Sequence, residues 1–195
     1  MRKGHIFFIS WIAWAWKGTL IKELLKEDSL NLKLSLSCKT RKPRSWEILW
    51  VDYIYMTEKE FKEAINKWEF LEYNYIHNQA YYWTRIKDIL DDWINTWKNI
   101  IKEVDILILP KILQENKIPK DDYTYIFIDI PLNLVKERMI DRWDDVSWDD
   151  YKNRFESAKK EKELLYLADY VIDWSMTREE VLKEAKSIII NNISK

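Results

Sequence analysis

A short basic run contains side chains that could bind a phosphate group. Residues 37–44 read SCKTRKPR and bring Ser37, Arg41 and Arg44 close together in sequence. A phosphate dianion is bound by planar guanidinium groups and hydroxyl donors that converge on it from several sides. A solvated basic surface or a nucleic-acid patch is the alternative. No further basic cluster accompanies the run, and 32 basic residues balance 33 acidic ones, so we expect neither a nucleic-acid partner nor a membrane partner.

A second candidate for phosphate chemistry is the segment 10–19, SWIAWAWKGT, which contains Lys17 near its end and leads into an amphipathic stretch. In a phosphate-binding loop, backbone N–H groups converge on the anion and a lysine reaches the β- and γ-phosphates. A secretory leader is the alternative, because Arg2 and Lys3 precede an apolar run at 6–16. That interpretation leaves Lys17 and the helix behind it unexplained, so we prefer the loop.

The composition of the chain bears on this loop, because 2 glycines and 12 tryptophans stand among 195 residues. Together they make up about 7% of the chain, which is the ordinary share of glycine alone. Several tryptophans fall where an element ends, as Trp46, Trp68 and Trp143 do, and glycine rather than tryptophan favours such places. We hypothesise that the gene uses UGA as a glycine codon and that these codons were translated as tryptophan. A genuinely tryptophan-rich core is the alternative.

With glycine restored, residues 10–19 read SGIAGAGKGT and contain G-x-x-x-x-G-K. Side chains at the glycine positions would obstruct the phosphates, so we predict that the chain with tryptophan at these positions is inactive. The helix that follows adds its positive end to the site. The predicted ATP-binding residues are Trp11, Ile12, Ala13, Trp14, Ala15, Trp16, Lys17, Gly18 and Thr19.

With glycine at positions 46 and 50, residues 35–53 resemble the guanylate kinase pattern S-x-x-x-R-x-x-R-x-G-E-x-x-G-x-D-Y. In that family the pattern holds the phosphate of GMP. The matching residues are Ser37, Arg41, Arg44, Glu47, Asp52 and Tyr53.

The resemblance continues through residues 68–84, WEFLEYNYIHNQAYYWT, which are similar to the family's G-E-F-(I/L)-E and Y-Y-G-(S/T) segments. It implies that Glu72 accepts hydrogen bonds from N1 and N2 of guanine, that Thr84 is a second base contact, and that Tyr82 joins Tyr53 on the phosphate. A carboxylate matches the paired donors of guanine, whereas adenine offers no such edge.

Further along the chain, the resemblance assigns carboxylates and mobile arginines. Glu103 and Asp105 stand at the end of a predicted buried strand, where nucleotide sites of α/β proteins gather carboxylates. The family continues there with Q-G, whereas this chain reads ILILPK. Arginines that close around the transferred phosphoryl group are the expected catalysts. The catalytic residues implied are Lys17, Arg138, Arg142 and Arg154.

The expected cofactor is Mg²⁺, carried by ATP rather than by a metal site of the protein, and lying near Thr19 and Asp105. Guanylate kinases usually have Ser or Thr where this chain has Gly18, so the hydroxyl at that position is missing. The two histidines are too few and too far apart for a metal-ligand pattern. The single Cys38 permits no internal disulfide, which suits the cytoplasm.

The hydrophobic pattern predicts the elements that would position these residues. Short apolar runs alternate with amphipathic segments, which is typical of a parallel sheet with helices on both faces. Strands are expected at 5–10, 32–37, 69–76, 79–83, 99–105, 123–131 and 170–173. Helices are expected at 18–27, 57–67, 84–96, 133–142, 149–168 and 177–190.

We therefore expect one α/β domain over 1–195: a three-layer P-loop fold with a GMP-binding insertion and a short lid. The core would comprise 1–36, 97–137 and 156–195, the insertion 37–96 and the lid 138–155. The implied reaction is phosphoryl transfer from ATP to GMP and to dGMP. The alternatives are a kinase for another nucleoside monophosphate and a non-catalytic binding module of the same family.

Overall fold

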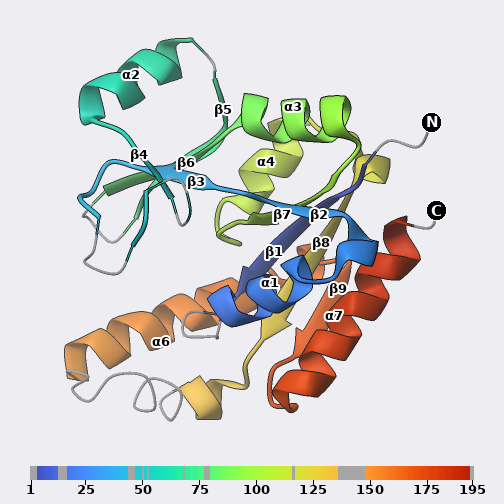
Figure 1. Cartoon of the computed structure of the whole chain (residues 1–195). Coiled ribbons are helices and arrows are strands. Elements are labelled where there is room, and N and C mark those ends of the chain that lie inside the picture. The colour runs from blue at the N-terminus through green and yellow to red at the C-terminus, as the bar shows by residue number, and fades with distance from the viewer. Residues whose placement is uncertain are drawn as a thin grey trace.

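The computed structural model describes residues 4–12, 17–43, 47–49, 51, 53–67, 69–76, 80–115, 117–135 and 148–193. Its centre is a five-stranded, all-parallel sheet in the order β2-β7-β1-β8-β9, as the α/β pattern predicted (Figure 1). Continuous apolar runs form the inner strands because both of their faces are covered. The strands are β1 (Ile6–Trp11), β2 (Leu32–Ser35), β7 (Asn99–Glu103), β8 (Tyr123–Asp129) and β9 (Tyr170–Asp173).

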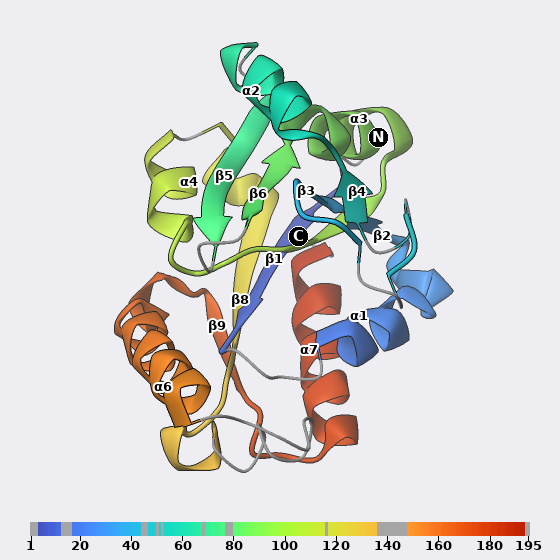
Figure 2. The same cartoon turned by 90° about the vertical axis from the view of Figure 1, so that its left-hand side faces the viewer.

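Helices cover both faces of this sheet. Figure 2 shows α1 (Lys17–Leu25) and α7 (Arg178–Ile193) on one side, and α4 (Leu109–Glu115) and α6 (Trp148–Glu163) on the other. Helix α3 (Ile86–Thr96) leads back into β7. Short 3₁₀ turns lie at Asp28–Leu30, Lys120–Asp122 and Leu165–Leu167. In the described part of the chain, no helix is both long and apolar enough to cross a bilayer.

A second, four-stranded sheet has the order β4-β3-β6-β5. Strand β3 pairs in parallel with β4 and antiparallel with β6, which pairs antiparallel with β5. Only Leu36 separates β2 from β3, so the chain passes directly from the carboxyl end of a core strand into this sheet. Its elements are β3 (Ser37–Lys39), β4 (Tyr53–Tyr55), α2 (Glu58–Asn66), β5 (Phe70–Ile76) and β6 (Ala80–Arg85).

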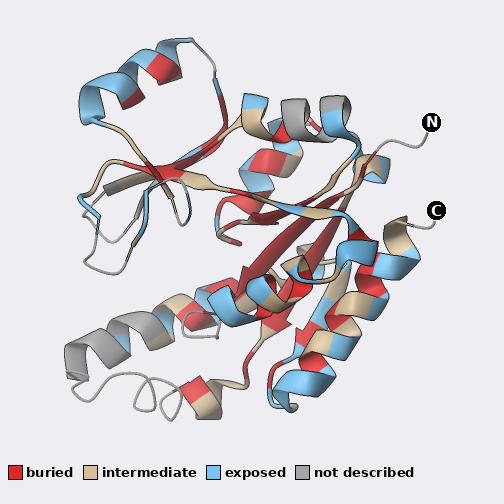
Figure 3. Ribbon diagram, viewed as in Figure 1, coloured by how far each residue is buried: buried red, intermediate tan, exposed pale blue. Residues whose placement is uncertain are grey.

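The two sheets have separate hydrophobic cores (Figure 3). The larger core joins the strands of the parallel sheet to its helices, and Ile6, Phe7 and Phe8 are fully buried in it. The smaller core lies between the second sheet and α2. Its buried members are Cys38, Ile54, Phe61, Ala64, Phe70 and Trp83.

A capping box begins each of the helices α2 and α7. The Glu60 amide donates to Thr57 Oγ1 over 3.2 Å, and the Thr57 amide donates to Glu60 Oε2 over 2.7 Å. At the start of α7, Thr177 and Glu180 exchange the same two bonds over 3.3 and 2.9 Å. These bonds satisfy N–H groups that a helix start leaves without intrahelical partners.

Some predicted boundaries were wrong. Residues 84 and 85 belong to β6, because antiparallel pairing with β5 extends to Arg85. The helix predicted at 149–168 ends at Glu163, and a 3₁₀ turn replaces its last part. Strand β4 and helix α4 were not predicted. Of the helix predicted at 133–142, residues 133–135 are helical, in a helix that begins at 132, and the rest lies outside the described residues.

Four tryptophans lie in the described part of the chain with their side chains. Trp97 ends α3 with φ 54° and ψ 26°, a left-handed conformation that glycine adopts more readily. Trp11, Trp83 and Trp174 are instead buried in the two cores. Trp97 thus fits the glycine hypothesis, whereas burial of the other three is also what genuine tryptophans would show.

Candidate functional site

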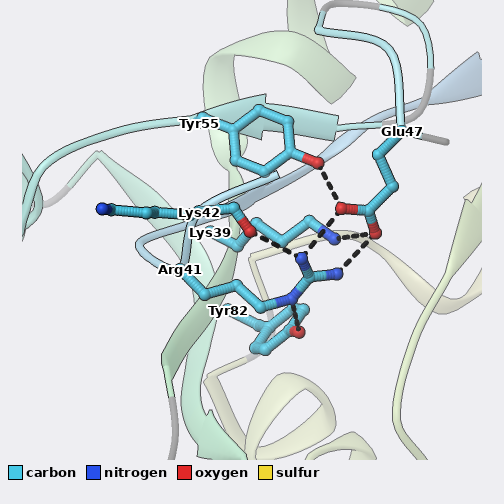
Figure 4. A network of polar contacts seen from close by, with 6 residues as sticks. All are labelled: Lys39, Arg41, Lys42, Glu47, Tyr55 and Tyr82. Atoms are coloured by element: carbon cyan, nitrogen blue, oxygen red, sulfur yellow. Dashed lines mark hydrogen bonds and ion pairs between the residues drawn. The ribbon is translucent and has the colours of Figure 1, made fainter. Parts of the chain in front are cut away.

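The basic run at the start of the second sheet forms a polar network around Glu47 (Figure 4). Arg41 binds this carboxylate through both terminal nitrogens, with Nη1 2.8 Å from Oε2 and Nη2 2.5 Å from Oε1. Lys39 Nζ donates to Oε1 over 3.0 Å, and Tyr55 Oη donates to Oε2 over 2.7 Å. Arg41 Nε also donates to Tyr82 Oη over 3.0 Å. The network thus joins β3, β4 and β6 in one polar surface.

The charge of this network favours an anion. The Lys39 side chain is fully buried and that of Glu47 is 7% exposed. The Lys39 ammonium also lies 2.9 Å from the centroid of the Tyr53 ring, a cation–π contact. The network thus gathers two cations, Lys39 and Arg41, and cations of this kind bind ligands such as a phosphate.

Two further predicted residues, Glu72 on β5 and Thr84 on β6, lie side by side. Thr84 Oγ1 donates a short hydrogen bond to Glu72 Oε1, and both side chains are buried. Burial raises the pKa of Glu72, while the Lys102 ammonium and the Thr84 hydrogen bond act in the opposite direction. A buried carboxylate beside a hydroxyl can accept from paired N–H donors of a planar ring.

Ser37, at the start of β3, faces the parallel sheet. Its Oγ accepts a 2.7 Å hydrogen bond from Lys102 Nζ on β7. Lys102 is fully buried. This contact ties the second sheet to the core at the point where the chain leaves β2.

The two predicted carboxylates lie at or just beyond the carboxyl end of β7. Glu103 is the last residue of the strand and is half-buried. Burial raises the pKa of Tyr53, and the charge of Glu103 raises it further. Asp105 Oδ1 accepts from the Leu107 amide over 2.9 Å. Ligands of open α/β sheets bind at this edge.

The predicted ATP loop is described only at its two ends. Trp11 ends β1 and Ile12 follows it, with the Ile12 amide donating to the Ile128 carbonyl over 3.3 Å. Both side chains are buried in the core. Helix α1 begins at Lys17, and Gly18 and Thr19 are exposed in its first turn. A Cβ at Gly18 would meet no atom within 4 Å.

Several predicted residues lie outside what the structure describes. Four of them belong to the ATP loop and three are arginines. For Lys17 and Arg154 the backbone is described, at the start of α1 and within α6, but the side chain is not. The residues outside the description are Ala13, Trp14, Ala15, Trp16, Arg44, Arg138 and Arg142.

Two buried lysines of the site were missed by sequence reasoning. Lys39 was counted only within the basic run, and Lys102 was counted only as part of a buried strand. A lysine in an otherwise apolar run such as NIIKEV is the signal that could have found Lys102, because lysines are rarely buried without partners. Glu47 was a member of the motif without an assigned role.

A hollow of about 880 Å³ lies at the opposite edge of the parallel sheet. Gly4, Asn99, Tyr123 and Tyr170 line it, where the core strands begin. Because ligands of such sheets bind at the carboxyl ends, this hollow is not part of the candidate site.

The sequence profile of the guanylate kinase family matches residues 12–192. A guanylate kinase of Clostridioides difficile is 32% identical over 192 residues, covering 96% of this chain and 86% of its own. One from Mycoplasma mobile is 32% identical over 196 residues, covering 99% and 96%. The crystal structure of guanylate kinase from Anaplasma phagocytophilum has the same fold, with a TM-score of 0.76 at 22% identity, and the match covers 100% of this chain and 88% of that one.

Proposed function

The chain belongs to the guanylate kinase family, and on that premise we propose which of its residues transfer a phosphoryl group from ATP to GMP. The reaction gives ADP and GDP. One observation carries the assignment: the second sheet brings a guanidinium–tyrosine cluster and a buried Glu–Thr pair together, one suited to a phosphate and the other to a guanine.

The phosphate of GMP would be bound at the network around Glu47. Arg41 already donates to Tyr82, so the two groups can turn to one anion together. Ser37 adds a hydroxyl from β3, and the Tyr53 ring lies over Lys39. Arg44 would complete the set as a second guanidinium.

The guanine ring would be bound at Glu72 and Thr84. An ionised Glu72 accepts from both N1–H and N2–H, while Thr84 holds the carboxylate and offers a second contact. Adenine presents no such pair of donors, and its binding would leave the buried carboxylate without partners. The site therefore selects guanine, and it accepts dGMP as well as GMP.

ATP would be bound by the backbone of residues 11–19, with Lys17 at the transferred phosphoryl group. Arg138, Arg142 and Arg154 would close over it from a lid at 138–155, while the second sheet serves as a GMP-binding insertion at 37–96. Charge spreads over the phosphoryl oxygens in the transition state, so cations that meet it there lower the barrier.

Mg²⁺ would accompany ATP. Thr19 is exposed in the first turn of α1, and Asp105 lies beyond the carboxyl end of β7, so a hydroxyl and a carboxylate are available at the same edge. This small donor set fits a magnesium ion that keeps most of its waters and its phosphate ligands. The ion would neutralise charge on the phosphates.

We assign the activity to the chain that has glycine at the twelve tryptophan positions, and we place it in the cytoplasm, where its single cysteine stays reduced. A coupled assay of ADP release with GMP, dGMP, AMP and UMP tests the proposal. Turnover of GMP and dGMP far above AMP and UMP is expected. Equal rates with AMP would point to another nucleoside monophosphate kinase, and GMP binding without ADP release would point to a non-catalytic module.

A further inference from the structure

Lys102 is a charged residue in the middle of an apolar strand. It lies on β7 beside Ile100 and Ile101, and all three are fully buried. Removing an ammonium group from water is strongly unfavourable unless other groups compensate for the lost hydration. A buried lysine at this place therefore calls for specific partners.

Those partners are oxygens at the junction of the two sheets. Lys102 Nζ donates to Ser37 Oγ over 2.7 Å and to the Ser35 carbonyl over 3.3 Å. Ser35 also pairs with Lys102 in the β2–β7 register. Both acceptors are neutral, and within the described ranges no carboxylate forms an ion pair with this ammonium. Its charge is therefore balanced over a longer distance.

The charges of Lys102 and Glu72 act on each other's pKa. Burial lowers the pKa of Lys102, and Glu72 is the first of the charges that raise it. In return, Lys102 is the leading influence that opposes the raised pKa of Glu72. The other groups facing Lys102 are Cys38, Glu103 and Asp88, and those facing Glu72 are Thr84, Asp105 and Lys111.

We propose that Lys102 is a positioning residue for GMP, which fixes the Ser37 hydroxyl by a hydrogen bond and supplies a buried positive charge to the side of the site that holds Glu72. The inference rests on the proposed function, because that function makes Ser37 a phosphate contact and Glu72 a base contact. Lys102 itself is fully buried, so it would act on the nucleotide through Ser37 and Glu72 and not by direct contact. One buried charge would thus serve both ends of the substrate.

Three variants of the full chain with glycine at the twelve positions test this inference. Lys102→Met keeps the length of the side chain and removes its charge. Lys102→Gln keeps an N–H donor for Ser37 without the charge. Lys33→Met, at an exposed position on the neighbouring strand β2, is the matched control.

For Lys102→Met we expect the Kd of GMP at pH 7 to rise about tenfold, whereas the Kd of ATP stays unchanged. The pH at which GMP affinity is half-maximal should move upward by about one unit, because Glu72 then loses its proton only at higher pH. Lys102→Gln should regain part of the affinity but show the same shifted pH profile. Lys33→Met should match the parent in both measurements.

A titration without nucleotide separates this inference from the proposed function. The carboxyl carbon of Glu72, followed by NMR, should titrate at higher pH in Lys102→Met than in the parent. That result supports the inference even where no variant binds GMP, an outcome that would overturn the proposed function alone. Equal Glu72 midpoints in the parent and both Lys102 variants would overturn the inference.

Discussion

The Glu47 carboxylate accepts hydrogen bonds from three side chains of the candidate site. It accepts from Arg41, Lys39 and Tyr55, and its own side chain is 7% exposed. A buried charge is tolerated only when its partners stay in place. The network therefore stabilises the second sheet before any ligand binds.

Glu47→Gln should lower the free energy of unfolding by about 3–5 kcal/mol, because it leaves the buried Lys39 ammonium without its counter-charge. Urea unfolding followed by circular dichroism measures the loss. Glu63→Gln, at an exposed position on α2 of the same unit, is the control and should change stability little. Equal stability of the two variants would show that the network contributes nothing.

Glu72→Gln should weaken GMP binding by roughly 1–3 kcal/mol, about 5- to 150-fold in Kd, because an amide presents a donor to one of the two guanine donors. ATP binding should not change. Isothermal titration of each nucleotide checks both statements. Glu69→Gln, at an exposed position just before β5, is the matched control. A Glu72→Gln chain that binds GMP as tightly as its parent would contradict the base assignment.

The residues of the candidate site were predicted where the sequence resembles the guanylate kinase pattern. Arg41 and Tyr82, or Glu72 and Thr84, stand far apart in sequence, yet the structure places each pair in hydrogen-bond contact. Lys39 was not predicted to be a buried residue because nothing in a basic run shows which cation turns inward. That choice depends on packing between strands that are distant in sequence.

Cys38 can report whether the second sheet is folded. This residue is buried on β3, and burial raises the pKa of its thiol to about 12. The thiolate is the reactive form, so Cys38 should be inert in the folded chain. We predict no modification by iodoacetamide at pH 8 within the time that fully modifies the urea-unfolded chain. Mass spectrometry detects the adduct without ambiguity, since the chain has one cysteine. Rapid labelling in native buffer would contradict the buried position of β3.

The two capping boxes lie in different parts of the fold: one begins α2, beside the second sheet, and the other begins α7, beside the parallel sheet. Removing one at a time should destabilise one part of the fold at a time. Thr57→Ala and Thr177→Ala should each cost about 1 kcal/mol, since each removes an acceptor from a helix start. Phe61 and Ala64 of α2 belong to the same small core as Cys38, so Thr57→Ala should speed the labelling of Cys38. Thr177→Ala acts on α7 and should lower the unfolding midpoint without that effect. Identical labelling rates in the two variants would show that the two parts open together.

The elements that were missed share a physical cause. Strand β4 has three residues and pairs in parallel with β3, so no periodic pattern marks it. Helix α4 contains Pro110 and follows directly on an apolar run, which resembles a continuing strand. The core strands, by contrast, are long apolar runs that were predicted to within about two residues, the usual limit for element ends. Tertiary contacts fix what short segments do not encode locally.

The candidate site lies where the parallel sheet meets the second sheet, and each of these sheets has its own hydrophobic core. Strand β7 and the segment that follows it contribute Lys102, Glu103 and Asp105, and the second sheet contributes the proposed base and phosphate contacts. A mutation in one sheet can therefore alter GMP binding without altering the other core. The tryptophans should likewise have separate effects. Those of the proposed ATP loop should affect ATP binding, and those of the second sheet should affect GMP binding.

The tryptophans of the ATP loop provide the last test. An indole at 14 or 16 would occupy space where backbone N–H groups must meet a phosphate, and glycine-only backbone conformations there would add about 1–3 kcal/mol of strain each. The chain with tryptophan should therefore fail to bind ATP. Trp11→Gly, Trp14→Gly and Trp16→Gly together should restore binding, whereas any one alone should not, because the remaining indoles still obstruct the same anion site.

Calorimetric titration with ATP and Mg²⁺ measures this directly, and Trp97→Gly is the control. That substitution relieves a left-handed φ of 54° at the end of α3, so it should raise stability without restoring ATP binding. Trp11, the last residue of β1, is buried in the core, so the triple variant should lose stability and is best titrated well below its unfolding temperature. Micromolar ATP binding by the unaltered chain would show that the loop tolerates tryptophan, and UGG codons at the twelve positions would refute the codon hypothesis itself.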